Sequence, residues 1–292
     1  QLGIDTFVFD DPAHYLCSAD LRAFVETNHL DLSLDGTFRP RLAFGSHDDA
    51  DHVYNTPRAW FIERTWDPHT VKWDGADADH APESDDIPWC MVPERKLTVE
   101  DVKYVLSSHY QGTPYDPYAS YGARENRGVY RSIGINRNDF MALIQIRPDV
   151  PAEQSAIEWV AYASNAFNTM VPFYANVTTT PEYLSCTTKE VSTDSFYWVS
   201  RMIAAMTDAS YSKSLIHAER YELGVLSASR ALIHQYDAKL LAEPDAGQRA
   251  ALRVEANEAI AKALKARAAD TLDKVLFELS SGMKNAFARS DA

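Results

Sequence analysis

The order of strand-like and helix-like segments is the feature of this sequence that most constrains its fold. Strand-like apolar runs follow one another at residues 128–135, 140–148, 155–164 and 171–179. Met141, Leu143 and Gln145 show the alternation expected of a paired strand near a core. From Ser195 the pattern becomes helical, and residues 212–292 are rich in Ala, Leu, Glu and Lys. Successive strands followed by helices predict an α+β fold with long C-terminal helices, rather than repeated strand–helix–strand units.

The first part of the chain mixes short helices with loops. Residues 18–30 are predicted to form a helix with Ser18 as its N-cap, whereas residues 31–66 are predicted to be rich in loops. Residues 67–96 contain Pro, Gly and many acidic side chains, which predicts a long surface excursion. Thr98 is predicted to begin another helix, because T-V-E-D matches a capping box.

Length and charge limit the classes of fold and partner. The chain has 292 residues, of which 46% are hydrophobic, and no repeat or linker divides it, so a single domain over residues 1–292 is expected. Its 42 acidic residues exceed its 28 Lys and Arg, giving a net charge of -14. This excess argues against nucleic acid and anionic membrane as partners. No apolar run approaches the ~20 residues of a membrane span.

The cysteines and the missing motifs argue against a cofactor or a metal. Cys17, Cys90 and Cys186 lie far apart and form no C-x-x-C pair, so neither a disulfide framework nor a zinc site is indicated. The small number of cysteines is consistent with a reducing, cytoplasmic location. The sequence also contains no G-x-G-x-x-G, Walker, H-E-x-x-H or G-x-S-x-G motif. We therefore expect neither a cofactor nor a metal.

The segment SSHYQGTPYDPY, residues 107–118, concentrates groups that can contact a ligand. His109, Tyr110, Tyr115 and Asp116 bring an imidazole, two phenols and a carboxylate to one turn, where Gly112 and Pro114 end the preceding helix. These side chains could line a substrate pocket. The structural alternative is that the tyrosines pack against the turn and that the aspartate binds backbone amides.

This segment and four others resemble, in order and spacing, the dipeptidases of the dipeptidase A type. The others are YNTPRAW at 54–60, IGINRN at 133–138, VPFYANV at 171–177 and STDSFYW at 192–198. Members of that family are N-terminal-nucleophile cysteine hydrolases. The resemblance implies a four-layer αββα sandwich and hydrolysis of dipeptides, without a metal. It also implies that a terminal cysteine attacks the peptide bond while its own α-amine, with a pKa of roughly 7.7–8.0, serves as the base.

The sequence departs from that pattern at its start. It begins with Gln1, and none of its cysteines is terminal. The resemblance therefore implies that the nucleophile lies in a preceding segment of the same polypeptide. On this hypothesis the intact protein is active and this portion alone is inactive. Cys17, Cys90 and Cys186 are rejected as nucleophiles, because no neighbouring residue in the sequence would activate them.

The resemblance also suggests which residues face the substrate. Arg201 lies where related hydrolases have an arginine near the cysteine, so it could stabilise the thiolate or hold a substrate carboxylate; a structural ion pair is the alternative. Further candidates, which could read the charged ends of a dipeptide, are Asn55, Arg58, Asn136 and Arg137.

Other functions stay open at this point. An amidase or acylase of the same fold would act on different C–N bonds, and a non-catalytic binding protein would lack the nucleophile altogether. The apolar stripes of the C-terminal helices would be covered equally well by the rest of the fold or by a homo-oligomer.

Overall fold

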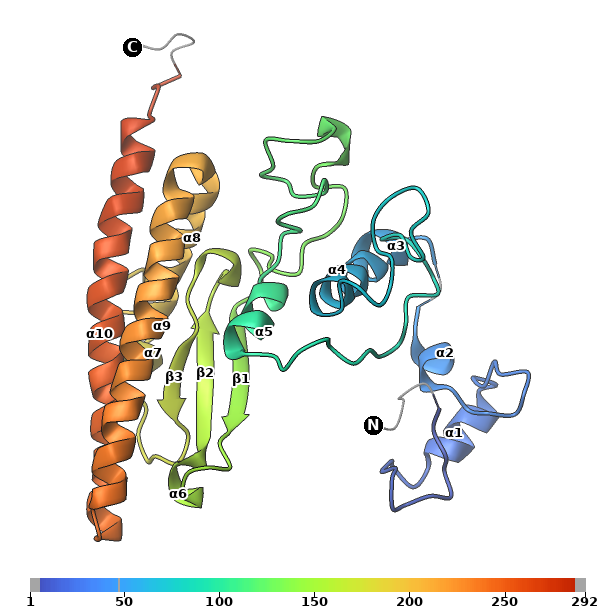
Figure 1. Cartoon of the computed structure of the whole chain (residues 1–292), viewed down its shortest axis with the longest axis horizontal. Coiled ribbons are helices and arrows are strands. Elements are labelled where there is room, and N and C mark those ends of the chain that lie inside the picture. The colour runs from blue at the N-terminus through green and yellow to red at the C-terminus, as the bar shows by residue number, and fades with distance from the viewer. Residues whose placement is uncertain (1–5, 47, 287–292) are drawn as a thin grey trace. The chain divides into compact units, whose positions relative to one another are not determined.

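The chain divides into two compact units, each of which is described by itself. The computed structural model describes residues 6–46 and 48–286 (Figure 1). Unit 1 consists of the described residues up to Val105 together with Tyr110–Ser132, and unit 2 of Leu106–His109 together with the described residues from Ile133 onward. The single domain expected over residues 1–292 stays a prediction, because this division concerns contacts and not independent folding. Helices and a sheet are both present, so the fold is α+β as predicted.

Unit 1 contains more helix than the sequence pattern predicted. Its helices are α1 (Leu21–Thr27), α2 (Pro40–Phe44), α3 (Asp51–Tyr54), α4 (Thr56–Trp66), most of α5 (Val99–Leu106) and the 3-10 turn η1 (Arg124–Asn126). The prediction that residues 31–66 are loop-rich is therefore wrong. Pro57 looks like a helix breaker in the sequence, but it lies in the first turn of α4, where proline is tolerated. The side chains of Trp60 and Phe61 on that helix are buried.

The two predicted helix starts have different outcomes. Ser18 is not the N-cap of α1, because the helix begins at Leu21 with Asp20 in the capping position. At α5 the capping box is confirmed. The amide of Asp101 donates to Thr98 Oγ1 at 3.2 Å, and the amide of Thr98 donates to Asp101 Oδ2 at 2.8 Å.

Residues 67–96 contain no helix or strand. Two large apolar side chains in this segment, Trp73 and Ile87, are each only 4% exposed. The indole of Trp73 donates to the carbonyl of Asp67 at 2.7 Å. The long loop therefore buries two large side chains although it has no regular secondary structure.

Unit 2 is built on a three-stranded antiparallel sheet. The strands β1 (Phe140–Ile146), β2 (Ala156–Tyr162) and β3 (Val171–Tyr174) lie in the order β1-β2-β3. They match three of the four predicted strands.

The fourth predicted strand, over residues 128–135, is wrong, because that segment lies partly in each unit and pairs with no strand. Instead, the backbone of this segment passes close to that of Ser107 and Ser108 at Gly134. The amide of Gly134 donates to the carbonyl of Ser108 at 2.8 Å, and a side chain there would lie 2.3 Å from the carbonyl oxygen of Ser107.

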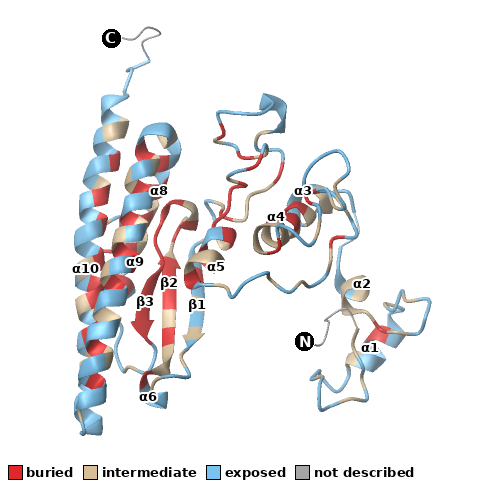
Figure 2. Ribbon diagram, in the orientation of Figure 1, coloured by how far each residue is buried: buried red, intermediate tan, exposed pale blue. Residues whose placement is uncertain are grey.

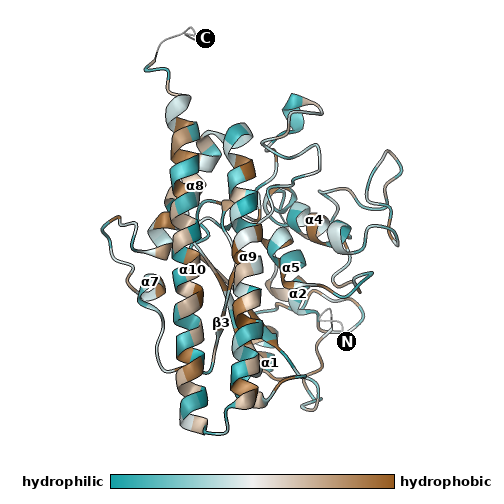
Figure 3. Ribbon diagram, turned by 60° about the vertical axis from the view of Figure 1, so that its left-hand side comes forward, coloured by the Kyte–Doolittle hydropathy of each residue, from teal (hydrophilic) through white to brown (hydrophobic). Residues whose placement is uncertain are grey.

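Helices complete unit 2. They are α6 (Ala152–Ser155), η2 (Asn165–Phe167), α7 (Glu182–Ser185), α8 (Phe196–Ala209), α9 (Tyr211–Ala242) and α10 (Ala246–Ser281). The last two run side by side, with apolar and polar residues alternating along them (Figure 3). They occupy the predicted helical region from residue 212 as far as Ser281, and the end of that region, residues 287–292, lies outside the described residues. No helix in the described ranges is long and apolar enough to cross a membrane.

The core of unit 2 lies between the sheet and the helices. Buried residues follow β2 and β3 and recur along α9 and α10 (Figure 2). Val160, Val171 and Phe173 pack with Phe196 of α8 and Ile260 of α10.

The edge strand β1 is buried on one face only. Met141 is buried, whereas Phe140, Ile144 and Ile146 are 55%, 69% and 64% exposed. Among the described residues, β1 pairs only with β2. An apolar strip and a strand edge are therefore left open.

Candidate functional site

The turn at residues 107–118 is divided between the units. His109 belongs to unit 2, whereas Tyr110, Tyr115 and Asp116 belong to unit 1. The backbone bends sharply at this point, because Tyr110 adopts a φ of 65° and Gly112 a φ of 79°. The hydroxyl of Thr113 donates to the carbonyl of Tyr110 at 2.8 Å and holds the bend.

His109 packs in an aromatic group of unit 2. It is 8% exposed, and its ring lies 6.1 Å from the ring of Phe167 and 6.0 Å from that of Tyr211. This is the environment of a core residue. A ligand contact by His109 stays a prediction.

Tyr110 and Arg58 meet at one backbone carbonyl in unit 1. The Tyr110 hydroxyl donates to the carbonyl of Arg131 at 2.9 Å, and Arg58 Nε donates to the same oxygen at 3.1 Å. Tyr110 is fully buried, with an edge-to-face contact to Phe61, and burial raises its pKa well above the ordinary value. Burial also lowers the pKa of Arg58. Both side chains therefore hold the fold of the turn.

Tyr115 and Asp116 also make internal contacts. The Tyr115 ring lies 5.9 Å from that of Trp60 and 4.8 Å from that of Tyr130. Asp116, which is 5% exposed, accepts a 2.9 Å bond from the amide of Tyr118. This backbone contact agrees with the structural alternative for the turn. Contact of either residue with a ligand stays a prediction.

Arg201 lies near Asn136 at the surface of unit 2. Its Nη1 donates to the carbonyl of Asn136 at 3.3 Å and to Asp139 Oδ1 at 3.4 Å. Its guanidinium also lies 5.9 Å from the ring of Tyr197. The side chains of Arg201 and Asp139 are 36% and 67% exposed, so this ion pair is weak. Arg137 is exposed.

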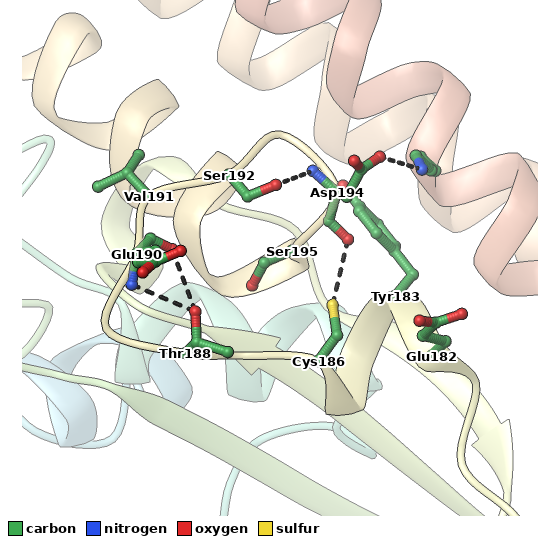
Figure 4. A pocket seen from close by; sticks show the side chains of 10 residues that line it. Glu182, Tyr183, Cys186, Thr188, Glu190, Val191, Ser192, Asp194 and Ser195 are labelled. Atoms are coloured by element: carbon green, nitrogen blue, oxygen red, sulfur yellow. Dashed lines mark hydrogen bonds and ion pairs between the residues drawn. The ribbon is translucent and has the colours of Figure 1, made fainter.

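A pocket of about 630 Å³ lies beside the segment STDSFYW (Figure 4). Asp194 lines it and forms a 2.7 Å ion pair with Lys265 of α10. The thiol of Cys186 points toward the backbone of Asp194 and donates to its carbonyl at 3.3 Å. Cys186 therefore serves as a donor to the backbone, and Cys17 and Cys90 are exposed.

A larger pocket, of about 1000 Å³, lies within unit 1. Residues of α2, one face of α4 and residues 85–89 line it. Of the predicted site residues, Asn55 lies in this pocket, where its side chain donates to Asp51 Oδ1. Glu63 also lines it, and burial raises the pKa of this carboxyl from 4.5 to about 7.

Glu63 and its neighbour Arg41 were missed in the sequence. Asn55, Ala59 and Glu63 follow at intervals of four, a spacing that places them on one face of a helix. That signal could have been found only if α4 had been predicted. No group of three His, Cys, Asp or Glu residues in the described ranges lies close enough to hold a metal ion.

Comparison with known proteins places this chain beside peptidases. The family model described as peptidase family C69 matches residues 1–224. A protein of Bifidobacterium longum named dipeptidase is 45% identical over 335 aligned residues, which cover 100% of this chain and 63% of that protein. A probable dipeptidase A of Streptococcus pyogenes is 45% identical over 292 residues, covering 100% of this chain and 59% of that protein. Dipeptidase A of Lactobacillus helveticus is 37% identical over 237 residues, covering 81% of this chain and 48% of that protein. The chain thus spans less than two thirds of the length of these relatives.

Proposed function

Because the chain belongs to peptidase family C69, we propose that it is part of a dipeptidase that cleaves dipeptides through an N-terminal cysteine lying upstream of Gln1. The observation that supports this most is the 45% identity, along the whole chain, to a relative named dipeptidase. Identity at this level over 100% of the chain goes far beyond a shared motif. The activity is proposed for the longer polypeptide, and this portion alone is expected to be inactive.

The proposed chemistry needs no cofactor. The α-amine of the terminal cysteine takes the thiol proton, and the thiolate attacks the carbonyl carbon of the peptide bond. The C–N bond breaks, the proton moves to the leaving amine, and the acyl group stays on sulfur as a thioester. Water then hydrolyses the thioester and restores the thiol. The cysteine is proposed to lie upstream because the family resemblance implies a terminal nucleophile, whereas Cys17, Cys90 and Cys186 are internal.

Arg201 is the residue of this chain that we propose to act at the reacting centre. Its bonds to Asn136 and Asp139 are 3.3 Å and 3.4 Å long, which is weak for a guanidinium, so it can exchange them for a thiolate or a substrate carboxylate. The guanidinium also lies over the aromatic ring of Tyr197, 5.9 Å from the ring centre, and this contact would help to hold it in place. Asn136 would then act by positioning Arg201.

We also propose that the sheet of unit 2 is one of the two sheets of an αββα sandwich. Its strands are antiparallel and helices pack against it. The open edge of β1 could pair with a further strand. The rest of the longer polypeptide would supply these elements.

The decisive experiment is to purify the natural polypeptide that contains these residues, determine its intact mass and N-terminal sequence, and assay it against dipeptides and acyl-amides. We expect a free N-terminal cysteine, hydrolysis of dipeptides, and loss of that hydrolysis when this cysteine is replaced by alanine. Faster hydrolysis of acyl-amides would instead identify an amidase or acylase. A native polypeptide without a terminal cysteine and without activity would leave a binding protein and refute the dipeptidase proposal.

A further inference from the structure

The pocket of unit 1 has no part in the catalytic steps proposed above. Its volume of about 1000 Å³ is enough for a small peptide. Ala59 and Glu63 of α4, with Asn55 in the position just before the helix, make one wall. Arg41 of α2 and Trp89 of the long loop after α4 line it as well. The pocket therefore combines an acid, a base and an aromatic ring.

One carboxyl oxygen of Glu63 has no hydrogen-bond donor in this pocket. This oxygen, Oε2, is buried and accepts no hydrogen bond within the described ranges. A buried carboxyl oxygen without a donor is costly for the folded protein, and a ligand with N–H groups would remove that cost. An ammonium group satisfies this oxygen best, since it supplies both donors and positive charge.

Arg41 offers the complementary group. Its guanidinium lies 4.9 Å from the ring centre of Trp89. A guanidinium that stacks on an aromatic ring keeps its N–H edge available for a carboxylate, which it can hold with two bonds. The positive charge of Arg41 also acts on Glu63, where it opposes the effect of burial on the pKa. The acid and the base thus lie close enough to influence each other.

The other charges of the pocket favour a ligand with a cationic end. His52 forms a 2.9 Å ion pair with Asp85, and Arg39 forms a 2.7 Å ion pair with Asp35, so two of the cationic side chains already face carboxylates. Three further carboxylates of the lining belong to Asp48, Asp49 and Asp51. The carboxylates of the lining therefore outnumber its cationic side chains, which favours a zwitterion over a simple anion.

We propose that this pocket binds a short zwitterionic peptide, whose α-ammonium contacts Glu63 and whose carboxylate contacts Arg41. The choice of a dipeptide as the ligand rests on the proposed function. Asn55 and Trp89 would contact the peptide between its two ends.

Capped peptides separate the two contacts in a binding experiment. Calorimetry of the 292-residue chain would use Ala-Ala, N-acetyl-Ala-Ala and Ala-Ala-amide as probes. Glu63→Gln should weaken binding of Ala-Ala about tenfold or more but leave binding of the N-acetyl peptide unchanged, because that peptide has no ammonium. Arg41→Gln should weaken Ala-Ala but not Ala-Ala-amide. Glu26→Gln, which changes an exposed acid of α1, should bind like the wild type.

The result that overturns the proposal is equal binding of capped and free peptides, or wild-type binding by both pocket variants. Circular dichroism of each variant shows whether it is folded. Kinetics of the natural polypeptide distinguish this inference from the proposed function. Hydrolysis of Ala-Ala by a polypeptide whose calorimetric binding of Ala-Ala is the same with Glu63 and with Glu63→Gln would refute the pocket and leave the dipeptidase. Binding that depends on Glu63, in a polypeptide that hydrolyses no dipeptide, would refute the dipeptidase and leave the pocket.

Discussion

Replacing Glu63 by Gln should change how the stability of the protein depends on pH. Burial raises the pKa of the Glu63 carboxyl in the folded protein from 4.5 to about 7, and the charges of His80 and Arg41 only partly oppose this. Between these two pH values the folded protein therefore binds more protons than the unfolded chain. The free energy of unfolding must then fall as pH rises through this window. Below it both states are protonated, and Glu63 contributes no pH dependence.

The size of the effect follows from the pKa difference. Without screening by solvent, the increase in the pKa of Glu63 from 4.5 to about 7 corresponds to a free energy of about 3 kcal/mol, since a change of one in pKa is worth about 1.36 kcal/mol. Glu63 is only half-buried, so screening by solvent reduces this to about 1–2 kcal/mol. A glutamine has the same shape and does not titrate.

Urea unfolding at several pH values between 5.5 and 8, monitored by tryptophan fluorescence, measures the difference. The advantage of Glu63→Gln over the wild type should grow with pH, whereas Glu26→Gln should follow the wild type. A constant difference between Glu63→Gln and the wild type over this range would refute the reasoning, because it would mean that Glu63 titrates normally in the folded protein.

Three further predictions concern unit 2 and the proposed reaction. Asn257→Ala should destabilise the protein by about 2–4 kcal/mol in urea unfolding, because its side chain bonds the buried amide and carbonyl of Tyr174 at 2.9 Å and 3.0 Å. Gly134→Ala should lower the melting temperature in calorimetry, since the new methyl group would lie 2.3 Å from the backbone oxygen of Ser107; unchanged melting would show that this backbone can move. In the natural polypeptide, Arg201→Ala should reduce kcat/KM for dipeptides about a hundredfold or more, with partial recovery in Arg201→Lys; wild-type kinetics would assign Arg201 a structural role.

The sheet and the long helices could be predicted because their signals are local. Residues 140–146 alternate between exposed side chains and side chains that are at least partly buried, and the helical composition persists over α9 and α10. The helices α2 and α3 were missed because they have only 5 and 4 residues, and α4 was missed because Pro57 in its first turn reads as a helix breaker. The segment around Gly134 is the opposite case, because a strand was predicted there and none forms. The run 128–135 has the composition of a strand, but a close backbone approach to Ser107, which no local pattern reveals, keeps it out of the sheet.

The site was less predictable than the fold, because the state of a side chain depends on residues far away in the sequence. Arg201 was found through the resemblance of its surrounding segment, and its neighbours Asn136 and Asp139 come from a different part of the chain. Glu63 is one acid among many in a chain with 42 acidic residues. Only the fold shows that its carboxyl oxygen is buried without a donor.

Internal bonding also decides which of the predicted residues can still bind a ligand. Tyr110, Arg58 and Asp116 already bond to backbone groups in the absence of a ligand. A ligand that took over those bonds would break internal ones, so the exchange would add little affinity. Glu63 differs, because a ligand that donates to its Oε2 makes a bond that the protein lacks. Affinity for a small charged peptide should therefore come mainly from groups that the fold leaves unsatisfied, and less from the tyrosine-rich turn that the sequence makes conspicuous.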